Sequence, residues 1–394
     1  MLIQPSHRLQ SLGQYAFDEI NQLVQGLKDK GLNPIDFGVG DPQEPAPLFV
    51  RERLKEAVDR YATTGYPSYI GSLPFRETCA RWMQRRFGVT LDPETEIASN
   101  IGGKEAVFHF PEAILNPGDI AIIPSPGYPP MRTGTLFAEG VPYFVPLLEK
   151  NNFLVDFEAI PHDIAKRAKI LWINYPNSPT GAVASREYYK RLVAWAKTHN
   201  ILIAADEGCY IDLYFNEKPL SILEVAREGI LTFYSLSKRN NMTGYRVGFV
   251  AGDPALVKLF KQLKTHIDSG TPDFIQEAAM AALEDETHVE EMRELYRQKR
   301  DILLDALGAV GLKTRLPEAT FYLWQKVPQG ITSVEFAKRL LAEELALVVT
   351  PGSMISQPCE DGTVPGEGYV RFALVPTVEE VKEAAERLKK TKLF

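Results

Sequence analysis

The sequence has few cysteine and histidine residues, which limits the kinds of site it can hold. Three cysteines stand far apart at Cys79, Cys209 and Cys359, and this odd number forms neither a disulfide framework nor a pair of metal ligands. The six histidines form no H-x-x-x-H or similar cluster. We therefore expect a protein that holds no metal.

Long apolar runs and an excess of positive charge are also absent. No stretch reaches the roughly 18 apolar residues of a membrane-spanning helix, and the first residues contain no apolar core of signal-peptide length. Acidic residues number 51 against 44 lysines and arginines, so a net charge of −7 offers no broad basic surface. We expect a soluble, cytoplasmic protein that binds neither nucleic acid nor a membrane.

The sequence does contain short apolar runs that alternate with a helical pattern, as is typical of an α/β fold. Each run ends in Pro, Asn, Asp, Ser or Gly, and such runs are typical of parallel strands buried on both faces. The segment 185–200 has apolar residues at helical spacing. The expected strands are 119–124, 169–174, 201–206, 230–235 and 246–252.

The character of the sequence changes near Glu284, where a long, charged, amphipathic helix is expected. Shorter strand-like pieces and a final helix follow it, at 320–327, 345–352, 368–375 and 378–390. A chain of 394 residues is long enough for two cores. We expect a large domain at 50–283, with a mostly parallel sheet between helices, and a smaller α+β domain formed by 1–49 and 284–394.

Polar side chains follow three of the expected strands. The strand at 169–174 leads into NYPNSPTG, the next strand ends in Asp206, and the strand after it leads into Ser235, Ser237 and Lys238. Open parallel sheets bind ligands beyond the carboxyl ends of their strands. We therefore expect an amide, a carboxylate and a lysine to converge at one edge of the sheet.

A pair of glycines, Gly102 and Gly103, precedes a helical pattern that ends near residue 110. Backbone N–H groups at such a helix start favour an anion, most plausibly a phosphate. The common nucleotide motifs are absent, because Lys104 is followed by Glu105 rather than Ser or Thr and Gln43 replaces the third glycine of a dinucleotide fingerprint. No G-x-S-x-G elbow of a serine hydrolase occurs either.

One ligand accounts for all of these groups. It would carry a phosphate, an aromatic nitrogen that faces a carboxylate, an oxygen that faces a donor and an aldehyde that faces a lysine. Pyridoxal 5′-phosphate has these four features. Lys238 would bind the aldehyde, and Asp206 would keep the pyridine nitrogen protonated. The groups expected around the phosphate are Ser235, Ser237, Arg246 and the amides of Gly103 and Lys104.

Eight motifs then resemble, in their order along nearly the whole chain, the class I and II aminotransferases of pyridoxal-phosphate fold type I. They are DFGVGDP, YPSYIGSLPFRE, GGKEAVF, PSPGYP, NYPNSPTG, ADE, SLSKRNNMTGYRVG and YVRFALV. Each motif is weak alone, and the shared order makes the resemblance specific. It implies an enzyme that moves an amino group between an amino acid, with glutamate as the expected donor, and a 2-oxo acid.

Carried over position by position, the resemblance implies roles for single residues. Lys238 resembles the lysine that binds the cofactor and acts as the catalytic base, and Asp206 resembles the partner of the pyridine nitrogen. Tyr128 matches the aromatic residue that stacks on the pyridine ring. Tyr66 resembles the tyrosine that reaches the phosphate of the neighbouring subunit, which implies a homodimer with shared active sites.

The resemblance also covers the residues that bind the phosphate of the cofactor and the α-carboxylate of the substrate. Ser235 and Arg246 match the family's phosphate-binding serine and arginine. Arg371, in YVRFALV, resembles the arginine that forks onto the α-carboxylate of the substrate, and Gly40 would lend its backbone near the same carboxylate.

Two positions depart from the family's pattern. An asparagine usually stands directly before P-T-G and donates to the ring oxygen of the cofactor. Here Ser178 has that place, with Asn177 one residue earlier, and either could fill the role. A catalytic tyrosine usually stands three residues after the aspartate, whereas Tyr210 stands four after Asp206. A bulge at Gly208 could restore the geometry, or Tyr210 does not reach the ring oxygen.

The substrate remains open at the level of the sequence. The stretches SLSKRNNMTGYRVGF and DEGCYIDLYF most resemble the N-succinyl-diaminopimelate aminotransferases of lysine biosynthesis, a branch near the aspartate and LL-diaminopimelate aminotransferases. An aspartate or other amino-acid aminotransferase is an alternative, and a carbon–sulfur lyase with the same cofactor is a second. Asn240 and Asn241 suit either a polar substrate tail or a turn.

Overall fold

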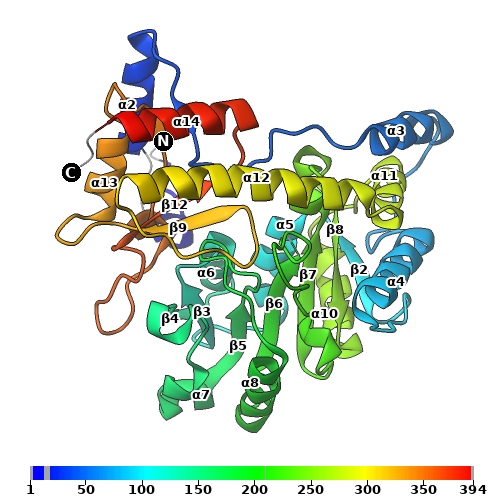
Figure 1. The fold of residues 1–394 in the computed structure, drawn as a ribbon. Helices are drawn as coiled ribbons and strands as arrows, with labels where there is room; N and C mark the ends of the chain where they lie inside the picture. Colours follow the sequence, from blue (N-terminus) through cyan, green and yellow to red (C-terminus); the bar gives the residue numbers. More distant parts are fainter. Residues whose placement is uncertain (1–2, 13–17, 209, 392–394) are drawn as a thin grey trace.

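A sheet of seven strands lies in the larger part of the molecule (Figure 1). The computed structural model describes residues 3–12, 18–208 and 210–391, so Cys209 lies outside the described residues. Neighbouring strands are parallel, except that β8 runs antiparallel to β7 and β2. The strand order is β2 (Ile97–Asn100), β8 (Gly248–Gly252), β7 (Ile230–Ser235), β6 (Leu202–Gly208), β5 (Ala168–Ile173), β3 (Ile120–Ser125) and β4 (Val141–Pro146).

Two hydrophobic clusters, one on each face of the sheet, explain why the sequences of the strands are continuous apolar runs. In β3, Ile120 and Ile122 pack into one cluster, while Ala121 and Ile123 pack into the other on the opposite face. Helices cover both faces, so both sets of side chains are buried. The first face is covered by α4 (Leu73–Phe87), α8 (Arg186–His199) and α11 (Asp273–Glu284), and the second by α5 (Gly103–His109), α6 (Pro129–Phe137) and α10 (Pro254–Lys264).

All five expected strands are present, with ends that differ from the expectation by at most two residues. The edge strand β4 was not expected, because Pro142 and Pro146 interrupt its pattern. Proline removes a backbone donor, which an edge strand tolerates on its unpaired side. The short strand β2 also escaped the sequence pattern, since it has only four residues.

A second part of the molecule has its own small sheets. Strands β11 (Thr350–Pro351), β12 (Tyr369–Ala373) and β9 (Tyr322–Lys326) form an antiparallel sheet, and β1 (Ile35–Asp36) pairs in parallel with β10 (Leu347–Val348). The helices that pack here are α2 (Asp18–Asp29), α12 (Thr287–Ala309), α13 (Ser333–Leu340) and α14 (Val378–Lys390). The remaining helices are α1 (His7–Gln10), α3 (Leu48–Arg60), α7 (His162–Arg167) and α9 (Leu236–Arg239).

The N-terminal and C-terminal segments share one hydrophobic core. Ile20, Leu27 and Phe37 belong to the same buried cluster as the side chains of α14, and Figure 1 shows blue α2 beside red α14. The division into a large domain at 50–283 and a small domain formed by 1–49 and 284–394 stays a prediction.

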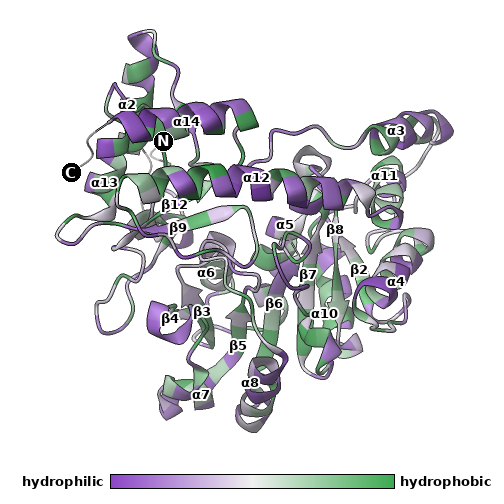
Figure 2. Ribbon diagram, in the orientation of Figure 1, coloured by the Kyte–Doolittle hydropathy of each residue, from purple (hydrophilic) through white to green (hydrophobic). Residues whose placement is uncertain are grey.

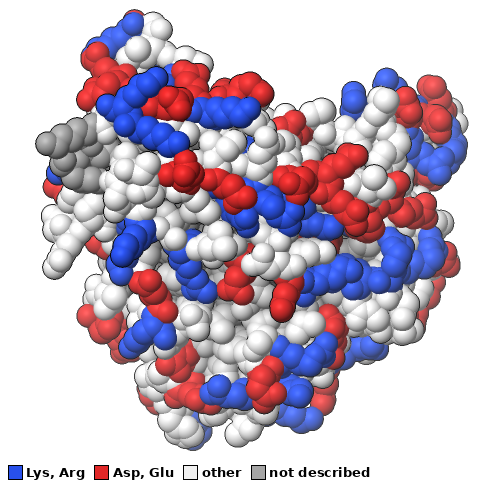
Figure 3. Space-filling view, in the orientation of Figure 1, with Lys and Arg blue, Asp and Glu red and all other residues white. Residues whose placement is uncertain are grey.

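Hydrophobic residues gather inside the molecule, and most charged residues lie on its surface. Figure 2 shows hydrophobic strands in the sheet and a largely hydrophilic α14, and in Figure 3 basic and acidic side chains are interspersed over the visible face. Among the helices of the described ranges, none is long and apolar enough to cross a membrane.

Candidate active site

Lys238 lies on the short helix α9, directly after the carboxyl end of β7. Its side chain is only 17% exposed, and Nζ donates a hydrogen bond of 2.5 Å to the backbone oxygen of Gly40. The carboxylate of Asp41 is 4.0 Å from the same nitrogen. The lysine therefore points towards the N-terminal segment rather than into open solvent.

A buried ion network holds the helix that carries Lys238. The neighbouring Arg239 donates from Nε to Asp212 at 2.6 Å, and Arg86 donates to the other oxygen of Asp212 at 2.7 Å. Burial raises the pKa of the Asp212 carboxyl, but the two guanidinium charges outweigh burial and lower that pKa below its ordinary value. Arg239 also pairs with Glu286, next to α12. Sequence reasoning missed this network, since no local motif links residues so far apart.

Asp206 lies at the carboxyl end of β6, beside a β-bulge. Asp206 is opposite Phe233 while Gly208 is opposite Tyr234, so Glu207 is an extra residue in the strand. A Cβ at Gly208 would lie 2.1 Å from the Cα of Tyr234, which only glycine avoids. The bulge takes up one residue of the spacing between Asp206 and Tyr210.

The carboxyl of Asp206 is suited to face a cationic ring nitrogen. It is 7% exposed, and burial raises its pKa to about 7, with only a backbone hydrogen bond from Gly208 acting in the other direction. Among the described residues, no basic side chain forms an ion pair with this carboxyl. A cation placed beside it would restore its ionised form, as expected for a protonated pyridine.

The turn after β5 places Asn177 and Ser178 differently. The amide of Asn177 donates to the backbone oxygen of Asn174 at 3.1 Å and accepts from the hydroxyl of Thr180 at 2.7 Å, so the turn itself uses this side chain. Asn174 donates to the backbone oxygen of Asp206 at 2.7 Å and accepts from the N–H of Ser178 at 2.9 Å. The half-buried Ser178 is thereby fixed beside the end of β6.

The residues expected around the phosphate lie together. Ser235 donates to the hydroxyl of Ser237 at 2.9 Å, and the same hydroxyl accepts from Nη1 of Arg246 at 3.4 Å. Gly102 adopts a φ of +76°, and a Cβ there would lie 2.1 Å from Nη2 of Arg246. Gly103, the first residue of α5, lies beside Ser235, since its Cβ would be 3.6 Å from that of the serine. Two hydroxyls, a guanidinium and a helix start thus meet, as a phosphate requires.

Three other expected residues lie at or between helices. Tyr128 is half-buried at the start of α6, shortly after the carboxyl end of β3. Lys104 is exposed, and it is the second residue of α5. Tyr66 is 88% exposed in the segment between α3 and α4, and contributes nothing to the site of its own chain that the structure records.

Arg371 and Gly40 meet through a residue that sequence reasoning missed, Tyr322. Nη2 of Arg371 donates to the backbone oxygen of Gly38 at 2.9 Å, and its guanidinium carbon lies 4.5 Å from the centre of the Tyr322 ring. The hydroxyl of Tyr322 is 2.9 Å from that of Tyr210. A continuous series of contacts thus joins Lys238, the 38–40 segment, Tyr322 and Arg371. Nothing in the local sequence distinguishes Tyr322 from its aromatic neighbours.

Asn240 belongs to the buried framework. It is fully buried, and its amide contacts the backbone oxygen of Ala282 at 3.3 Å and the ring of His288 at 2.6 Å. Of the two interpretations of the sequence, these contacts favour the structural one.

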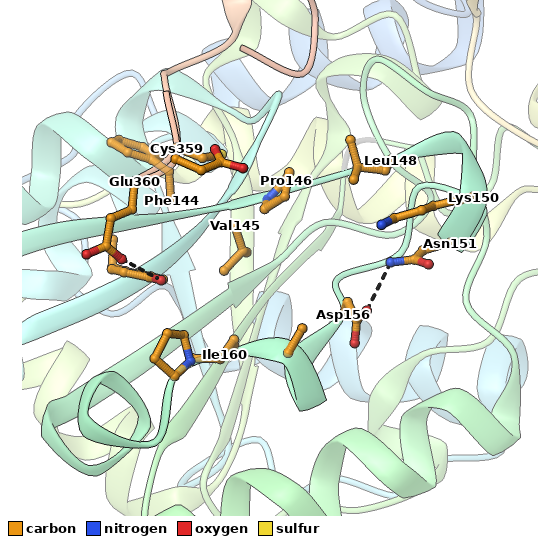
Figure 4. A pocket seen from close by; sticks show the side chains of 14 residues that line it. Phe144, Val145, Pro146, Leu148, Lys150, Asn151, Asp156, Ile160, Cys359 and Glu360 are labelled. Atoms are coloured by element: carbon orange, nitrogen blue, oxygen red, sulfur yellow. Dashed lines mark hydrogen bonds between the residues drawn. The ribbon is translucent and has the colours of Figure 1, made fainter. Parts of the chain in front are cut away.

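A surface pocket of about 460 Å³ lies away from these residues, at the edge strand β4 (Figure 4). Figure 4 shows Cys359 and Glu360 on one side of it and Lys150 and Asn151 on the other. None of the predicted site residues lines it.

Comparisons with known proteins agree with the fold. The LL-diaminopimelate aminotransferase of Aquifex aeolicus is 46% identical over 98% of this chain and 99% of its own length. The apo structure of BacF from Bacillus subtilis superposes with a TM-score of 0.91 at 35% identity, over 99% of this chain and 98% of BacF. A probable N-succinyldiaminopimelate aminotransferase from Thermus thermophilus gives 0.87 at 31% identity, over 95% and 99%.

The fold is that of the pyridoxal-phosphate aminotransferases, with a mostly parallel sheet between helices. The family model for aminotransferase class I and II matches residues 33–388, and the chain belongs to this family. It is an aminotransferase that uses pyridoxal 5′-phosphate, as the order of its motifs predicted.

Proposed function

We propose that the enzyme transfers an amino group between LL-diaminopimelate and 2-oxoglutarate, in lysine biosynthesis. The series of contacts from Lys238 to Arg371 supports the proposal, because it brings together a lysine that would act on the amino group and an arginine that would bind the substrate's carboxylate. The relative named as an LL-diaminopimelate aminotransferase is 46% identical, whereas the structure named for the N-succinyl compound is 31% identical. The unmodified amino acid is therefore preferred over the N-succinyl substrate that the sequence stretches suggested.

The cofactor would be held at four points. Asp206 would face the ring nitrogen, and Tyr128 would lie against the ring. Tyr210 would face the ring oxygen, and Ser178 is better placed than Asn177 to join it, because the turn occupies the Asn177 amide. The phosphate would be held by Ser235, Ser237, Arg246 and the amides of Gly103 and Lys104. When bound, the cofactor supplies an electron sink for the bond broken at the substrate's Cα.

Lys238 and Arg371 would act on the substrate. The α-carboxylate would bind the guanidinium of Arg371, whose buried Nε has no hydrogen-bond partner among the described residues. Gly40, which leaves room for the Tyr322 hydroxyl, would lie beside the same carboxylate. Nζ of Lys238 would take the proton from the Cα of the amino donor. In the second half of the reaction it would give a proton to the Cα of the amino acid formed from the 2-oxo acid.

The proposal includes a homodimer whose subunits share their active sites. Tyr66 is far too exposed to serve its own chain, and it would reach the phosphate of the partner. Apolar side chains of α3, of α4 and of the segment between them are also exposed, as an interface requires; they are Leu48, Val58, Tyr69 and Leu73. Figure 1 shows α3 at the margin of the molecule, joined by a long connection.

We also place the enzyme in the cytoplasm. The two described cysteines, Cys79 and Cys359, are free thiols, which suits a reducing compartment.

A substrate comparison tests the function. Purified enzyme with pyridoxal phosphate and 2-oxoglutarate is offered LL-diaminopimelate, its N-succinyl derivative, aspartate or cystathionine, and glutamate formation is measured. We expect the highest kcat/KM with LL-diaminopimelate. Faster transfer from the N-succinyl derivative or from aspartate would show that this compound, and not LL-diaminopimelate, is the substrate. Release of pyruvate and ammonia from cystathionine, without formation of glutamate, would identify a carbon–sulfur lyase.

A further inference from the structure

Tyr322 contacts three parts of the site at once. It is almost fully buried on β9, with its ring face against the Arg371 guanidinium at 4.5 Å. Its hydroxyl is 2.9 Å from the hydroxyl of Tyr210. A Cβ at Gly40 would lie 2.0 Å from the same hydroxyl, so no larger residue at position 40 is compatible with this tyrosine.

The strand register places Tyr322 beneath the arginine. In the antiparallel pair of β9 and β12, Arg371 is opposite Trp324, and Tyr322 is two residues before Trp324. Residues two apart share a face of a sheet, so Tyr322 is the diagonal neighbour of Arg371. A shift of one residue would move the ring to the other face.

The ring and two acceptors fix the plane of the guanidinium. Nη2 of Arg371 donates to the backbone oxygen of Gly38 at 2.9 Å and to the hydroxyl of Thr350 at 3.3 Å. The ring of Tyr322 covers one face of the same group. These contacts leave the buried Nε without a partner among the described residues, available to a carboxylate. A guanidinium held in one plane binds a carboxylate with less loss of freedom.

We infer that Tyr322 is a positioning residue that couples the carboxylate-binding arginine to Tyr210 at the cofactor ring. The inference rests on the proposed function, because it takes Arg371 as the substrate arginine. The ring face orients Arg371, and the hydroxyl orients the phenol of Tyr210. One side chain thereby links the substrate's carboxylate to the hydrogen bonding of the cofactor.

Two substitutions separate the action of the Tyr322 ring on Arg371 from the action of its hydroxyl on Tyr210. Both variants are measured as full-length enzyme loaded with pyridoxal phosphate. Tyr322→Phe keeps the ring and removes the hydroxyl, and Tyr322→Leu removes both. The first readout is the dissociation constant of 2-oxoglutarate, which binds the aldehyde form without reacting. The second is the pH midpoint of the visible absorbance band, which responds to hydrogen bonding at the cofactor ring.

We expect Tyr322→Phe to move the pH midpoint while 2-oxoglutarate binding changes less than about threefold. Tyr322→Leu is expected to weaken 2-oxoglutarate binding by about three- to thirtyfold, as the loss of a cation–π contact implies. Matched controls are Tyr296→Phe, which removes a buried hydroxyl that has no partner in the described structure, and Phe372→Leu, next to Arg371 in the strand. Both controls should leave both readouts unchanged.

An unmoved pH midpoint in Tyr322→Phe would overturn the link to Tyr210. Unweakened binding in Tyr322→Leu, or equal weakening in Phe372→Leu, would overturn the action on Arg371. If the leucine variant does not fold, the inference can be tested with Tyr322→Phe. It would be overturned if this variant weakened the binding of 2-oxoglutarate as much as Arg371→Lys does. A wild-type enzyme without a visible band would instead refute the proposed function.

Discussion

The side chain of Lys238 and the backbone of Gly40 are joined by a hydrogen bond of 2.5 Å, although 198 residues separate them in the sequence. The contact links the end of the large sheet to the N-terminal segment, which shares its core with the C-terminal helix. The site is therefore built by both parts of the molecule. Substitutions in either part should affect the same chemistry.

Replacing Lys238 should abolish turnover and leave the fold intact. We expect Lys238→Ala to reduce kcat by at least about a thousandfold, because the base at Cα is lost. Steady-state kinetics and circular dichroism measure the two properties. The exposed pair formed by Lys197 and Glu228 offers a control, and Lys197→Ala should keep wild-type kinetics. Near-normal turnover in Lys238→Ala would refute its assignment.

Replacing Arg371 by lysine tests the fork geometry. Lysine keeps the charge but presents a single ammonium group, so it cannot hold a carboxylate at two points. We expect Arg371→Lys to raise KM for both the amino acid and the 2-oxo acid by roughly tenfold to a hundredfold, as the loss of a charged hydrogen bond implies. An effect on only one of the two substrates would show that Arg371 does not bind their shared α-carboxylate.

Asp212 should be important for stability rather than for chemistry. Asp212→Ala leaves the buried guanidinium of Arg86 without a counter-ion and that of Arg239 with Glu286 alone, and we expect a loss of about 3–5 kcal/mol in the free energy of unfolding. Denaturant titration measures it. The exposed pair of Arg191 and Glu158 is the matched control, and Glu158→Ala should cost at most about 1 kcal/mol. Equal losses in the two variants would contradict this account.

The buried carboxyl of Glu207 should make the free energy of unfolding depend on pH. It accepts hydrogen bonds from the N–H of Ile222 at 2.6 Å and the hydroxyl of Tyr234 at 2.7 Å, yet burial raises its pKa from 4.5 to about 7. The folded state then binds more protons than the unfolded state, so stability falls as the pH rises from about 4.5 to 7.

The substitution Glu207→Gln removes this titration and keeps the size of the side chain. The variant should lose less stability than wild type between pH 5 and pH 8, by on the order of 3 kcal/mol. Thermal or denaturant unfolding across this range measures the difference. Parallel pH profiles for the two proteins would show that Glu207 is ionised in the folded protein throughout.

Sequence reasoning predicted the elements that depend on local pattern. The strand at 230–235 and the helix at 378–390 have the limits expected, because apolar runs and helical periodicity encode them directly. The edge strand β4 depends on pairing with another strand, which no local pattern encodes, whereas the bulge beside Gly208 is one of the two alternatives that the spacing from Asp206 to Tyr210 suggested. Tyr322 was missed for the same reason as β4, since its contact with Arg371 arises from the register of two strands.

The absorbance spectrum of the purified enzyme, loaded with pyridoxal phosphate, tests the central claim most directly. LL-diaminopimelate is added alone, without a 2-oxo acid. The account predicts a yellow protein whose visible band is lost as the amino group passes to the cofactor, and whose band returns when 2-oxoglutarate is added. A protein that takes up no pyridoxal phosphate, or whose band LL-diaminopimelate leaves unchanged, would contradict it.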